Sequence, residues 1–346
     1  MSLSILSFAS DYQEGAHEAI LERLCRTNLQ KTDGYGTDEF CASAREKIRA
    51  ACRCPEAAVH FLVGGTQTNA TVIDALLKSY QGVIAADSGH ISTHEAGAIE
   101  LGGHKVLALP HRFGKIDAAA IRDFCAAFWS DGNRDHMVMP GMVYLSQPTE
   151  YGTLYSLAEL TAIKEVCLAY DIPLYVDGAR LAYALACTEN DVTLRDLAGL
   201  CDVFYIGGTK CGALFGEAVV IPDPTLQPHF FTIMKQHGAL LAKGRILGLQ
   251  FDTLFTNDLY AKIGRTAVEA ADRMRAILQE KGYRLAIQTA TNQVFVILEN
   301  SAVEQLSEKL GFSFWEKYDE THTVVRLAAS WATRPEDVEA LSEILP

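Results

Sequence analysis

The chain has 346 residues, of which 49% are hydrophobic and 21% charged, and its formal net charge is −13. These proportions are ordinary for a folded globular protein, and the length exceeds the ~250–300 residues at which single cores stop growing, so we expect two lobes. The negative charge argues against nucleic acid or an anionic membrane as a partner, because both select for basic surfaces.

Targeting and metal-binding signals are weak. No apolar run approaches the ~20 residues that a membrane helix needs, and the N-terminal stretch MSLSILSFASDYQEG lacks the basic start of a signal peptide. The nine cysteines are scattered, and the close pair in CRCP does not have the spacing of a zinc site. We therefore expect a cytoplasmic protein with reduced thiols and no metal.

The first half of the chain alternates short apolar runs with helical patterns. Two amphipathic helices are predicted first, at 15–28 and 37–52. Strands are then predicted at 57–63, 82–86, 104–110, 142–147, 173–177 and 202–210, and helices at 66–80, 117–129, 156–170 and 179–187. Continuously hydrophobic strands of this kind are typical of a parallel sheet covered on both faces, which predicts an α/β layer.

The pattern changes after about Pro222. A mainly helical stretch at 225–255 is followed by a long charged helix at 258–282. The tail predicts strands at 292–298 and 322–330 and helices at 302–310 and 334–345. We therefore divide the chain into a large domain of residues 1–245, including the N-terminal helices, and a small α+β domain of residues 246–346.

Two charged residues stand at the ends of neighbouring predicted strands. Asp177 ends PLYVD and Lys210 ends DVFYIGGTK, at the edge where α/β sheets bind ligands. A carboxylate beside a pyridine nitrogen favours its protonated form, and a lysine amine can hold an aldehyde as a Schiff base. Singly, Asp177 is explained as a helix cap and Lys210 as a solvated charge. Together they predict a pyridoxal 5′-phosphate (PLP) site.

Two further segments fit such a site. In FLVGGTQTNATVIDALL a helix begins where a strand breaks at glycines, so Gly65, Thr66 and Gln67 are candidate phosphate ligands, although a plain tight turn is the alternative. His90 follows the strand GVIAA and is placed to stack on the cofactor ring, unless it belongs to a merely polar loop. His94 and Glu95 do not complete the H-E-x-x-H order of a zinc site.

Seven motifs carry a resemblance over nearly the whole chain. They are FASDYQEG, GYGTDEF, GGTQTNA, DSGHISTHEAGA, YVDGARLAYA, FYIGGTKCGALFGEAVV and VVRLAASW. In this order they resemble the threonine aldolase family, fold-type I PLP enzymes of the beta-eliminating lyase group, and in particular its low-specificity threonine and phenylserine aldolases. The resemblance implies an aspartate-aminotransferase-like large domain with a mainly parallel sheet, and a homodimer or homotetramer with sites at the subunit interface. The implied reaction cleaves the Cα–Cβ bond of a β-hydroxy-α-amino acid, giving glycine and an aldehyde.

The resemblance also implies roles for individual residues. Lys210 would be the Schiff-base lysine, Asp177 the partner of the ring nitrogen and His90 the stacked histidine. The remaining cofactor ligands would be Arg180, Thr209 and, from a neighbouring subunit, Lys243 or Arg245. The substrate ligands would be Ser10, Tyr35, Arg180 and Arg326, of which Arg326 grips the carboxylate.

One departure from the family leaves the catalytic base open. Many threonine aldolases carry a second histidine after the strand that MVYLSQ matches, where this chain has Pro148, Thr149 and Glu150. His90, Glu150 or a bound water are the candidates for removing the hydroxyl proton. Another PLP activity on the same fold, β-elimination or transamination, is the alternative function. A non-catalytic α/β ligand-binding protein that uses the GGTQTN turn is a third reading.

Overall fold

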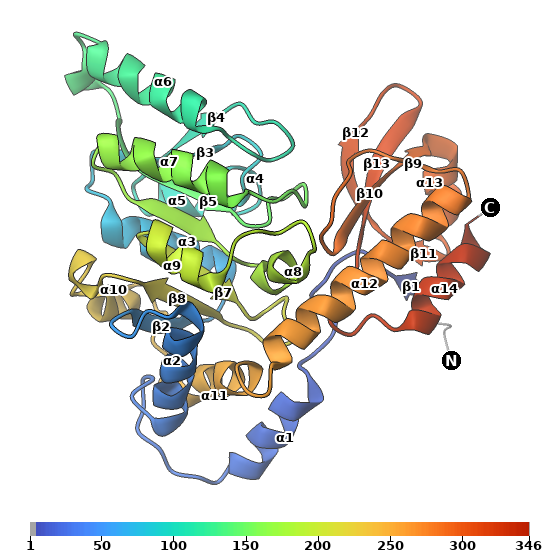
Figure 1. Ribbon diagram of the computed structural model, residues 1–346, viewed down its shortest axis with the longest axis horizontal. Helices are drawn as coiled ribbons and strands as arrows, with labels where there is room; N and C mark the ends of the chain where they lie inside the picture. The colour runs from blue at the N-terminus through green and yellow to red at the C-terminus, as the bar shows by residue number, and fades with distance from the viewer. Residues whose placement is uncertain (1–4, 346) are drawn as a thin grey trace.

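The computed structural model describes residues 5–345 of the chain, which form a large and a small lobe joined by one long helix (Figure 1). Residues 1–4, part of the stretch on which the signal-peptide expectation depends, lie outside the described residues. The connecting helix, α12 (Leu259–Glu280), begins against the large lobe and runs along the small one.

A seven-stranded sheet in the order β2–β8–β7–β6–β5–β3–β4 forms the centre of the large lobe. Among these described strands, β8 alone runs in the direction opposite to the other six. The strands are β2 (Ala58–Leu62), β3 (Gln81–Ala86), β4 (Lys105–Leu109), β5 (Met139–Ser146), β6 (Leu174–Asp177), β7 (Val203–Gly207) and β8 (Glu217–Ile221). The prediction of a mainly parallel α/β large domain is confirmed.

Helices cover both faces of this sheet, which is why its strands are hydrophobic without alternation. One face packs against α1 (Glu18–Thr27), α2 (Glu39–Cys52), α6 (Ala118–Ser130), α7 (Leu157–Ala169), α8 (Leu181–Ala186), α9 (Leu194–Leu200) and α11 (Arg245–Leu254). The other face packs against α3 (Gly65–Leu76), α4 (His90–Thr93), α5 (Ala98–Leu101) and α10 (Phe230–Gln236). Two short 3-10 turns occupy Arg134–His136 and Pro224–Leu226.

The small lobe is a four-stranded antiparallel sheet packed against helices, as expected of an α+β lobe. Its strands are β12 (Ser313–Lys317), β13 (His322–Ala328), β10 (Gln293–Glu299) and β9 (Arg284–Leu285), and its further helices are α13 (Asn300–Ser307) and α14 (Pro335–Ile344). Sequence analysis predicted β10, β13 and both helices but missed β9 and β12. β9 has two residues, and β12 is an edge strand whose Phe314 is 68% exposed, so neither shows a buried face in the sequence.

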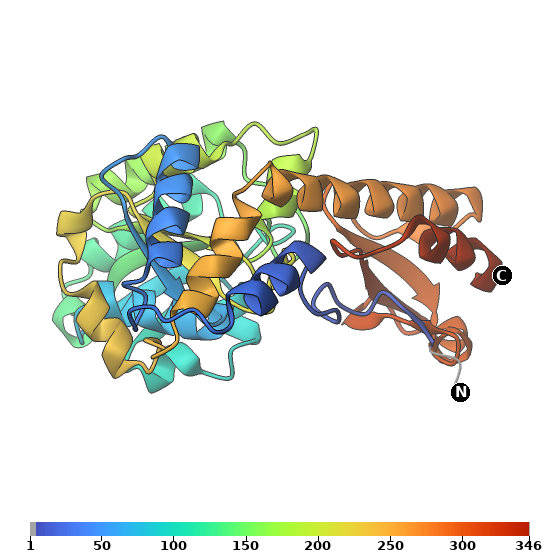
Figure 2. The same ribbon diagram turned by 90° about the horizontal axis from the view of Figure 1, so that it is seen from below.

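The N-terminal segment belongs to the small lobe before it enters the large one (Figure 2). β1 (Leu6–Ser7) pairs in parallel with β11 (Leu310–Gly311), and Phe8 is buried in the core of the small lobe. The chain then crosses to the large lobe, where His17 N donates to Gly212 O at 2.9 Å. The domain division at residues 245 and 246 stays a prediction.

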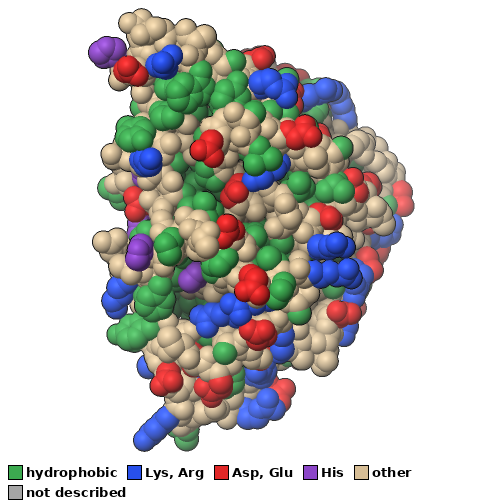
Figure 3. Space-filling model, turned by 60° about the vertical axis from the view of Figure 1, so that its left-hand side comes forward, with side chains coloured by type: hydrophobic (Ala, Val, Ile, Leu, Met, Phe, Trp, Pro, Cys, Tyr) green, Lys and Arg blue, Asp and Glu red, His purple; other side chains and the backbone are tan. Residues whose placement is uncertain are grey.

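The surface shows no gathering of one charge on the side seen in Figure 3, where basic and acidic side chains are interspersed. Over residues 5–345, no helix combines the length and the hydropathy of a membrane span. Within the same residues, no three His, Cys, Asp or Glu side chains are grouped as metal ligands.

Candidate active site

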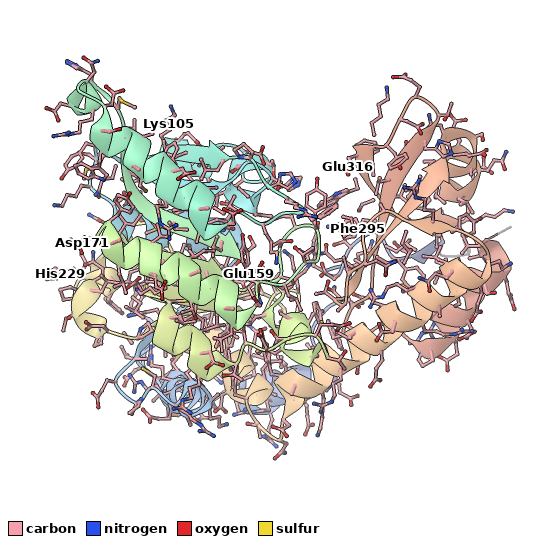
Figure 4. All side chains as sticks on the ribbon, turned by 45° about the horizontal axis from the view of Figure 1, so that its top comes forward. Lys105, Glu159, Asp171, His229, Phe295 and Glu316 are labelled. Carbon is pink, nitrogen blue, oxygen red and sulfur yellow. The ribbon has the colours of Figure 1, made fainter. Side chains whose placement is uncertain are left out.

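Two adjoining cavities lie at the carboxyl ends of the parallel strands. The inner cavity, about 290 Å³, is lined by the large lobe and by Tyr12, and the outer cavity, about 590 Å³, is lined by side chains of both lobes. Five residues line both: Tyr12, His90, Glu150, Arg180 and Lys210. Glu316 of the outer cavity lies on the edge of the small lobe that faces the large lobe (Figure 4).

Asp177 forms the floor of the inner cavity and is fully hydrogen-bonded. It accepts from Tyr144 Oη at 2.6 Å, Tyr205 Oη at 2.5 Å, Asn69 Nδ2 at 3.1 Å and its own turn at Ala179 N, 2.9 Å. Burial raises the pKa of this carboxyl, but the neighbouring His90 and the hydrogen bonds from the two tyrosine hydroxyls outweigh it, and the pKa falls below its ordinary value. Asp177 is therefore ionised at neutral pH. It does not cap α8, whose N-cap is Arg180.

Lys210 lies opposite this carboxylate, in the turn that follows β7. Gly208 makes the turn possible, because a Cβ there would stand 2.6 Å from Gly216 O. The Lys210 carbonyl accepts a hydrogen bond from Tyr183 Oη, and its Nζ lies 5.9 Å from the centre of the Tyr12 ring. Burial, reinforced by the charge of Arg180, lowers the pKa of the ammonium. A lowered pKa increases the share of neutral amine, the form that attacks an aldehyde.

The start of α3 and the turn before Lys210 meet at one end of the inner cavity. α3 begins at Gly65, and among the described residues no side chain caps it, so its first N–H groups can bind an anion. Gly65, Thr66 and Thr209 all line this cavity. Gln67 does not, since its Nε2 donates to His237 O at 3.3 Å.

His90 begins α4 and is held from two sides. Its Nδ1 is 2.7 Å from Glu95 Oε1, which also accepts from Asn69 Nδ2. Its backbone N donates to Glu150 Oε1 at 3.0 Å. Ser146 Oγ donates to the same Glu150 oxygen at 2.6 Å, and burial raises the pKa of Glu150.

A second imidazole, His94, lines the outer cavity with its ring 5.7 Å from that of His90. Burial, the neighbouring His90 and the charge of Arg326 lower its pKa, so it is neutral at pH 7. The sequence suggests only a metal-ligand role for His94, because nothing in its spacing predicts that it lines a cavity.

Arg180 is tied to an acid that sequence analysis did not single out. Its Nε and Nη2 donate to the two oxygens of Asp11 at 2.6 and 3.0 Å, and Asn292 Nδ2 donates to Asp11 at 2.9 Å. Burial opposes ionisation of Asp11, but Arg180 lowers its pKa to about 2. This pair holds the segment that crosses between the lobes against the edge of the sheet.

Arg326, in contrast, is poorly satisfied. Its Nη1 donates to Gln293 Oε1 at 3.1 Å, and its Nη2 has only long contacts of 3.3 and 3.4 Å, to Ala9 O and Ser313 Oγ. Its Nε is buried without a partner among residues 5–345, as is Ser10 Oγ. Burial and the charge of Arg180 lower the pKa of Arg326 to about 10. Unpaired buried donors of this kind suit an anionic ligand.

Aromatic side chains form the wall of the outer cavity around Arg326. Tyr151 Oη donates to Glu316 Oε2 at 2.8 Å and so joins the two lobes. The Trp315 ring lies edge-on to Tyr151 at 5.2 Å, and the Arg326 guanidinium lies 5.5 Å from the centre of Trp315.

Five candidates from the sequence line neither cavity: Gln67, Ser10, Tyr35, Lys243 and Arg245. Tyr35 is exposed and its ring lies 4.5 Å from Lys235 Nζ, and Lys243 is also exposed. Arg245 is bound within its own chain, to Gln30 O at 2.8 Å and to Thr27 Oγ1 at 2.7 Å. Neither Tyr35 nor Lys243 reaches the site of its own chain.

Sequence analysis also missed Tyr205 and Glu217, which line the inner cavity, and Tyr144, which donates to Asp177. Each lies on a strand and resembles an ordinary core residue in the sequence. A usable signal was present, because both tyrosines lie near the carboxyl ends of strands in the same sheet as the strand of Asp177.

Comparison with known proteins agrees with this geometry. The beta-eliminating lyase family model matches residues 7–301. The low specificity L-threonine aldolase of Pseudomonas aeruginosa is 30% identical over 97% of this chain and 95% of its own length. A structure of Leishmania major threonine aldolase is 42% identical, covers 98% of each chain and superimposes with a TM-score of 0.94.

Aspartate aminotransferase from Thermus thermophilus covers 98% of this chain and 90% of its own, with a TM-score of 0.71 at 16% identity, and so shares the fold alone. The predicted fold-type I architecture is thus confirmed. The match of the family model to most of the chain, together with the 30% identity to a curated relative over nearly its whole length, shows that the chain belongs to the threonine aldolases of the beta-eliminating lyase family.

Proposed function

We propose that the protein is a PLP-dependent aldolase that cleaves the Cα–Cβ bond of β-hydroxy-α-amino acids, giving glycine and an aldehyde. The observation that carries this proposal is the meeting of Asp177 and Lys210 in one cavity, with an under-bonded Arg326 in the adjoining one. An ionised carboxylate, an amine of lowered pKa and an unpaired guanidinium together suit an amino-acid substrate. The L-threonine aldolases among its relatives support the same reaction.

The inner cavity fits PLP. When bound there, this cofactor supplies an electron sink for the pair released from the Cα–Cβ bond. Asp177 would keep the ring nitrogen protonated, and Lys210 would hold the aldehyde carbon through its amine. The uncapped start of α3, with Gly65, Thr66 and Thr209, would bind the phosphate. His90 would lie over the ring face.

Arg326 and Ser10 would bind the substrate carboxylate. Two donors of Arg180 are already hydrogen-bonded to Asp11, whereas Arg326 Nε and Ser10 Oγ have no partner within the described chain. A carboxylate fixed in this way orients the Cα–Cβ bond, and cleavage is fastest when that bond stands perpendicular to the conjugated ring.

His90 is the base that the geometry favours for the β-hydroxyl proton. Glu95 beside Nδ1 keeps the proton on that nitrogen and leaves the lone pair on Nε2. Glu150 is less suited, because its Oε1 already accepts two hydrogen bonds and burial favours its protonated form. Glu150 would instead position the His90 backbone.

A homodimer or homotetramer and a cytoplasmic location complete the proposal. Tyr35 and Lys243 lie on the surface, away from the cavities of their own chain, so a second copy would receive them at its own site. The nine cysteines, all among the described residues, are unpaired, which supports a reducing compartment.

An absorption spectrum of the purified protein with PLP, followed by borohydride reduction and peptide mapping, tests the cofactor assignment. We expect the label on Lys210, no label in Lys210→Ala, and a normal label in Lys262→Ala, which removes an exposed lysine on α12. A protein that stays colourless with added PLP would leave only a ligand-binding α/β fold.

A panel of threonine, allo-threonine and phenylserine then tests the reaction, with aldehyde, keto acid and ammonia measured separately. We expect aldehyde and glycine in equal amounts. Keto acid without ammonia would indicate transamination, and keto acid with an equal amount of ammonia would indicate β-elimination.

A further inference from the structure

A buried acid, Glu217, lies where the inner cavity would receive the phosphate. It is the first residue of β8, and in the sheet it pairs with Leu62 on one side and Gly207 on the other. The start of α3 follows Leu62, and the turn of Thr209 and Lys210 follows Gly207. Glu217 therefore stands between the two backbone segments that form this end of the cavity, and its side chain lines it.

The carboxyl group of Glu217 has no cationic partner. It is 2% exposed, and among the described residues no salt bridge involves it. Its Oε2 accepts from Gly208 N at 3.0 Å. A buried carboxyl with a single backbone donor is more stable neutral than ionised.

The surrounding groups agree with a neutral acid. Burial raises the pKa of Glu217 to about 8; the Thr209 hydroxyl, the Gly208 N–H and Lys210 act to lower it, and Asp177 acts to raise it. The other titratable groups near it are Tyr175, Tyr205, Tyr260 and Cys211, whose own pKa values its charge raises. All four are neutral at pH 7, so the charged groups that act on the Glu217 carboxyl are Lys210 and Asp177.

An ionised Glu217 would repel a phosphate group, which carries about −1.5 to −2 charges at neutral pH. A protonated carboxyl instead offers an O–H donor, and such a donor to an anionic oxygen makes a short, strong hydrogen bond. Resting on the PLP-binding function proposed above, we propose that Glu217 binds the cofactor phosphate as a neutral carboxylic acid, and that its deprotonation weakens cofactor binding in alkaline solution.

The test compares binding of PLP and of pyridoxal, which lacks the phosphate, to the apoprotein between pH 6.5 and 9. Both compounds carry the same aldehyde, so the ratio of their dissociation constants isolates the phosphate contribution from the titration of Lys210. We call the ratio of the pyridoxal dissociation constant to the PLP dissociation constant the PLP advantage. In the wild-type protein we expect it to fall about tenfold between pH 7 and pH 9, because Glu217 loses one proton in this range.

Glu217→Gln keeps the shape and a donor but cannot ionise. We expect its PLP advantage to match the wild-type value at pH 7 and to stay level up to pH 9. Glu150→Gln is the matched control, since it replaces another buried carboxyl that lines the same cavity. In Glu150→Gln we expect the PLP advantage to fall between pH 7 and pH 9 as it does in the wild-type protein.

Several results would overturn the inference. In the wild-type protein alone, a ratio of dissociation constants that does not change with pH would do so. In the variants, the contrary results are a ratio that still falls with pH in Glu217→Gln, or one that no longer falls in Glu150→Gln. A further contrary result is equal weakening of PLP and pyridoxal binding by Glu217→Gln. The last would mean that Glu217 only positions the turn before Lys210. Failure of the wild-type protein to bind PLP at all would instead remove the proposed function.

Discussion

Asp177 in the inner cavity and Arg326 in the outer cavity are both buried charges, but their surroundings differ. Asp177 receives four hydrogen bonds of 2.5 to 3.1 Å from its own chain. Arg326 makes contacts of 3.1 to 3.4 Å and leaves Nε unpaired within residues 5–345. The hydrogen bonds of Asp177 are thus complete before any ligand binds, whereas those of Arg326 are not.

This difference fits the two kinds of ligand. A resident cofactor needs one fixed electrostatic environment, which a closed network of tyrosine and amide donors supplies without reorganisation. A substrate must bind and leave in every turnover. A buried donor without a partner costs about 1–3 kcal/mol, and a bound carboxylate relieves that cost, so the outer cavity favours the liganded state.

Asp177→Asn should have the largest effect, because it breaks the closed inner network. Removing one member of a buried charge system costs about 3–5 kcal/mol, or about 10²–10⁴-fold in rate. We expect kcat to fall by this factor with the KM for threonine nearly unchanged, as measured by steady-state kinetics at saturating PLP. A fall of less than tenfold would mean that the network does not set the state of the ring.

Glu217→Gln tests the buried acid of the inner cavity through the stability of the apoprotein, without any ligand. The folded protein holds the pKa of this acid at about 8, above the ~4.3 of an unfolded glutamate. The contribution of Glu217 to the free energy of unfolding is therefore fully present below about pH 4.3 and is lost as the pH rises towards 8. We expect the apoprotein variant to be more stable than wild type by up to about 4 kcal/mol at pH 7.5.

The measurement is thermal unfolding of both apoproteins from pH 5 to pH 8. The gap in Tm should widen steadily with pH. Parallel curves would show that Glu217 titrates alike in the folded and unfolded chains.

Arg326→Gln probes the under-bonded outer cavity. A hydrogen bond to a charged group contributes about 1.5–3 kcal/mol, so KM should rise about 10–150-fold while PLP affinity stays unchanged. Arg334→Gln is the control, because Arg334 is exposed and pairs with Asp337 on the surface. A weaker PLP complex in Arg326→Gln would contradict the separation of the two cavities.

Ser10→Ala should have the smallest effect, and its two readouts should move differently. Loss of one neutral hydrogen bond to substrate raises KM about 2–10-fold. The stability of the apoprotein should stay level or rise slightly, because the hydroxyl that is removed has no partner in the described chain. A clear loss of apoprotein stability would show that the hydroxyl serves the fold rather than the substrate.

The sequence predicted best what depends on local periodicity. Apolar runs identified six of the seven strands of the large-lobe sheet but missed β8, and the rule that ligands bind at strand ends identified Asp177 and Lys210. Asp11 could not be found in this way, because its partner Arg180 is 169 positions further along the chain. Tyr144 and Tyr205 read as core aromatics, since hydrogen bonds to Asp177 leave no trace in hydrophobicity.

The outer cavity was harder still. Trp315 lies on the edge strand β12, which has no buried face to set a periodicity, and Arg326 was identified only through a family motif. The roles expected of Tyr35 and Lys243 need a second subunit and stay predictions.

The pairing of β1 with β11 has a consequence for how the protein is made. Leu6 pairs with Leu310, so β11, the partner of β1, emerges from the ribosome about 300 residues after it. At roughly 5–20 residues per second, this delay is about 15–60 s. During that time the crossing segment with Asp11 has no fixed place beside Arg180. The nascent chain can fold its large lobe early, but the active site is completed only after translation has nearly ended.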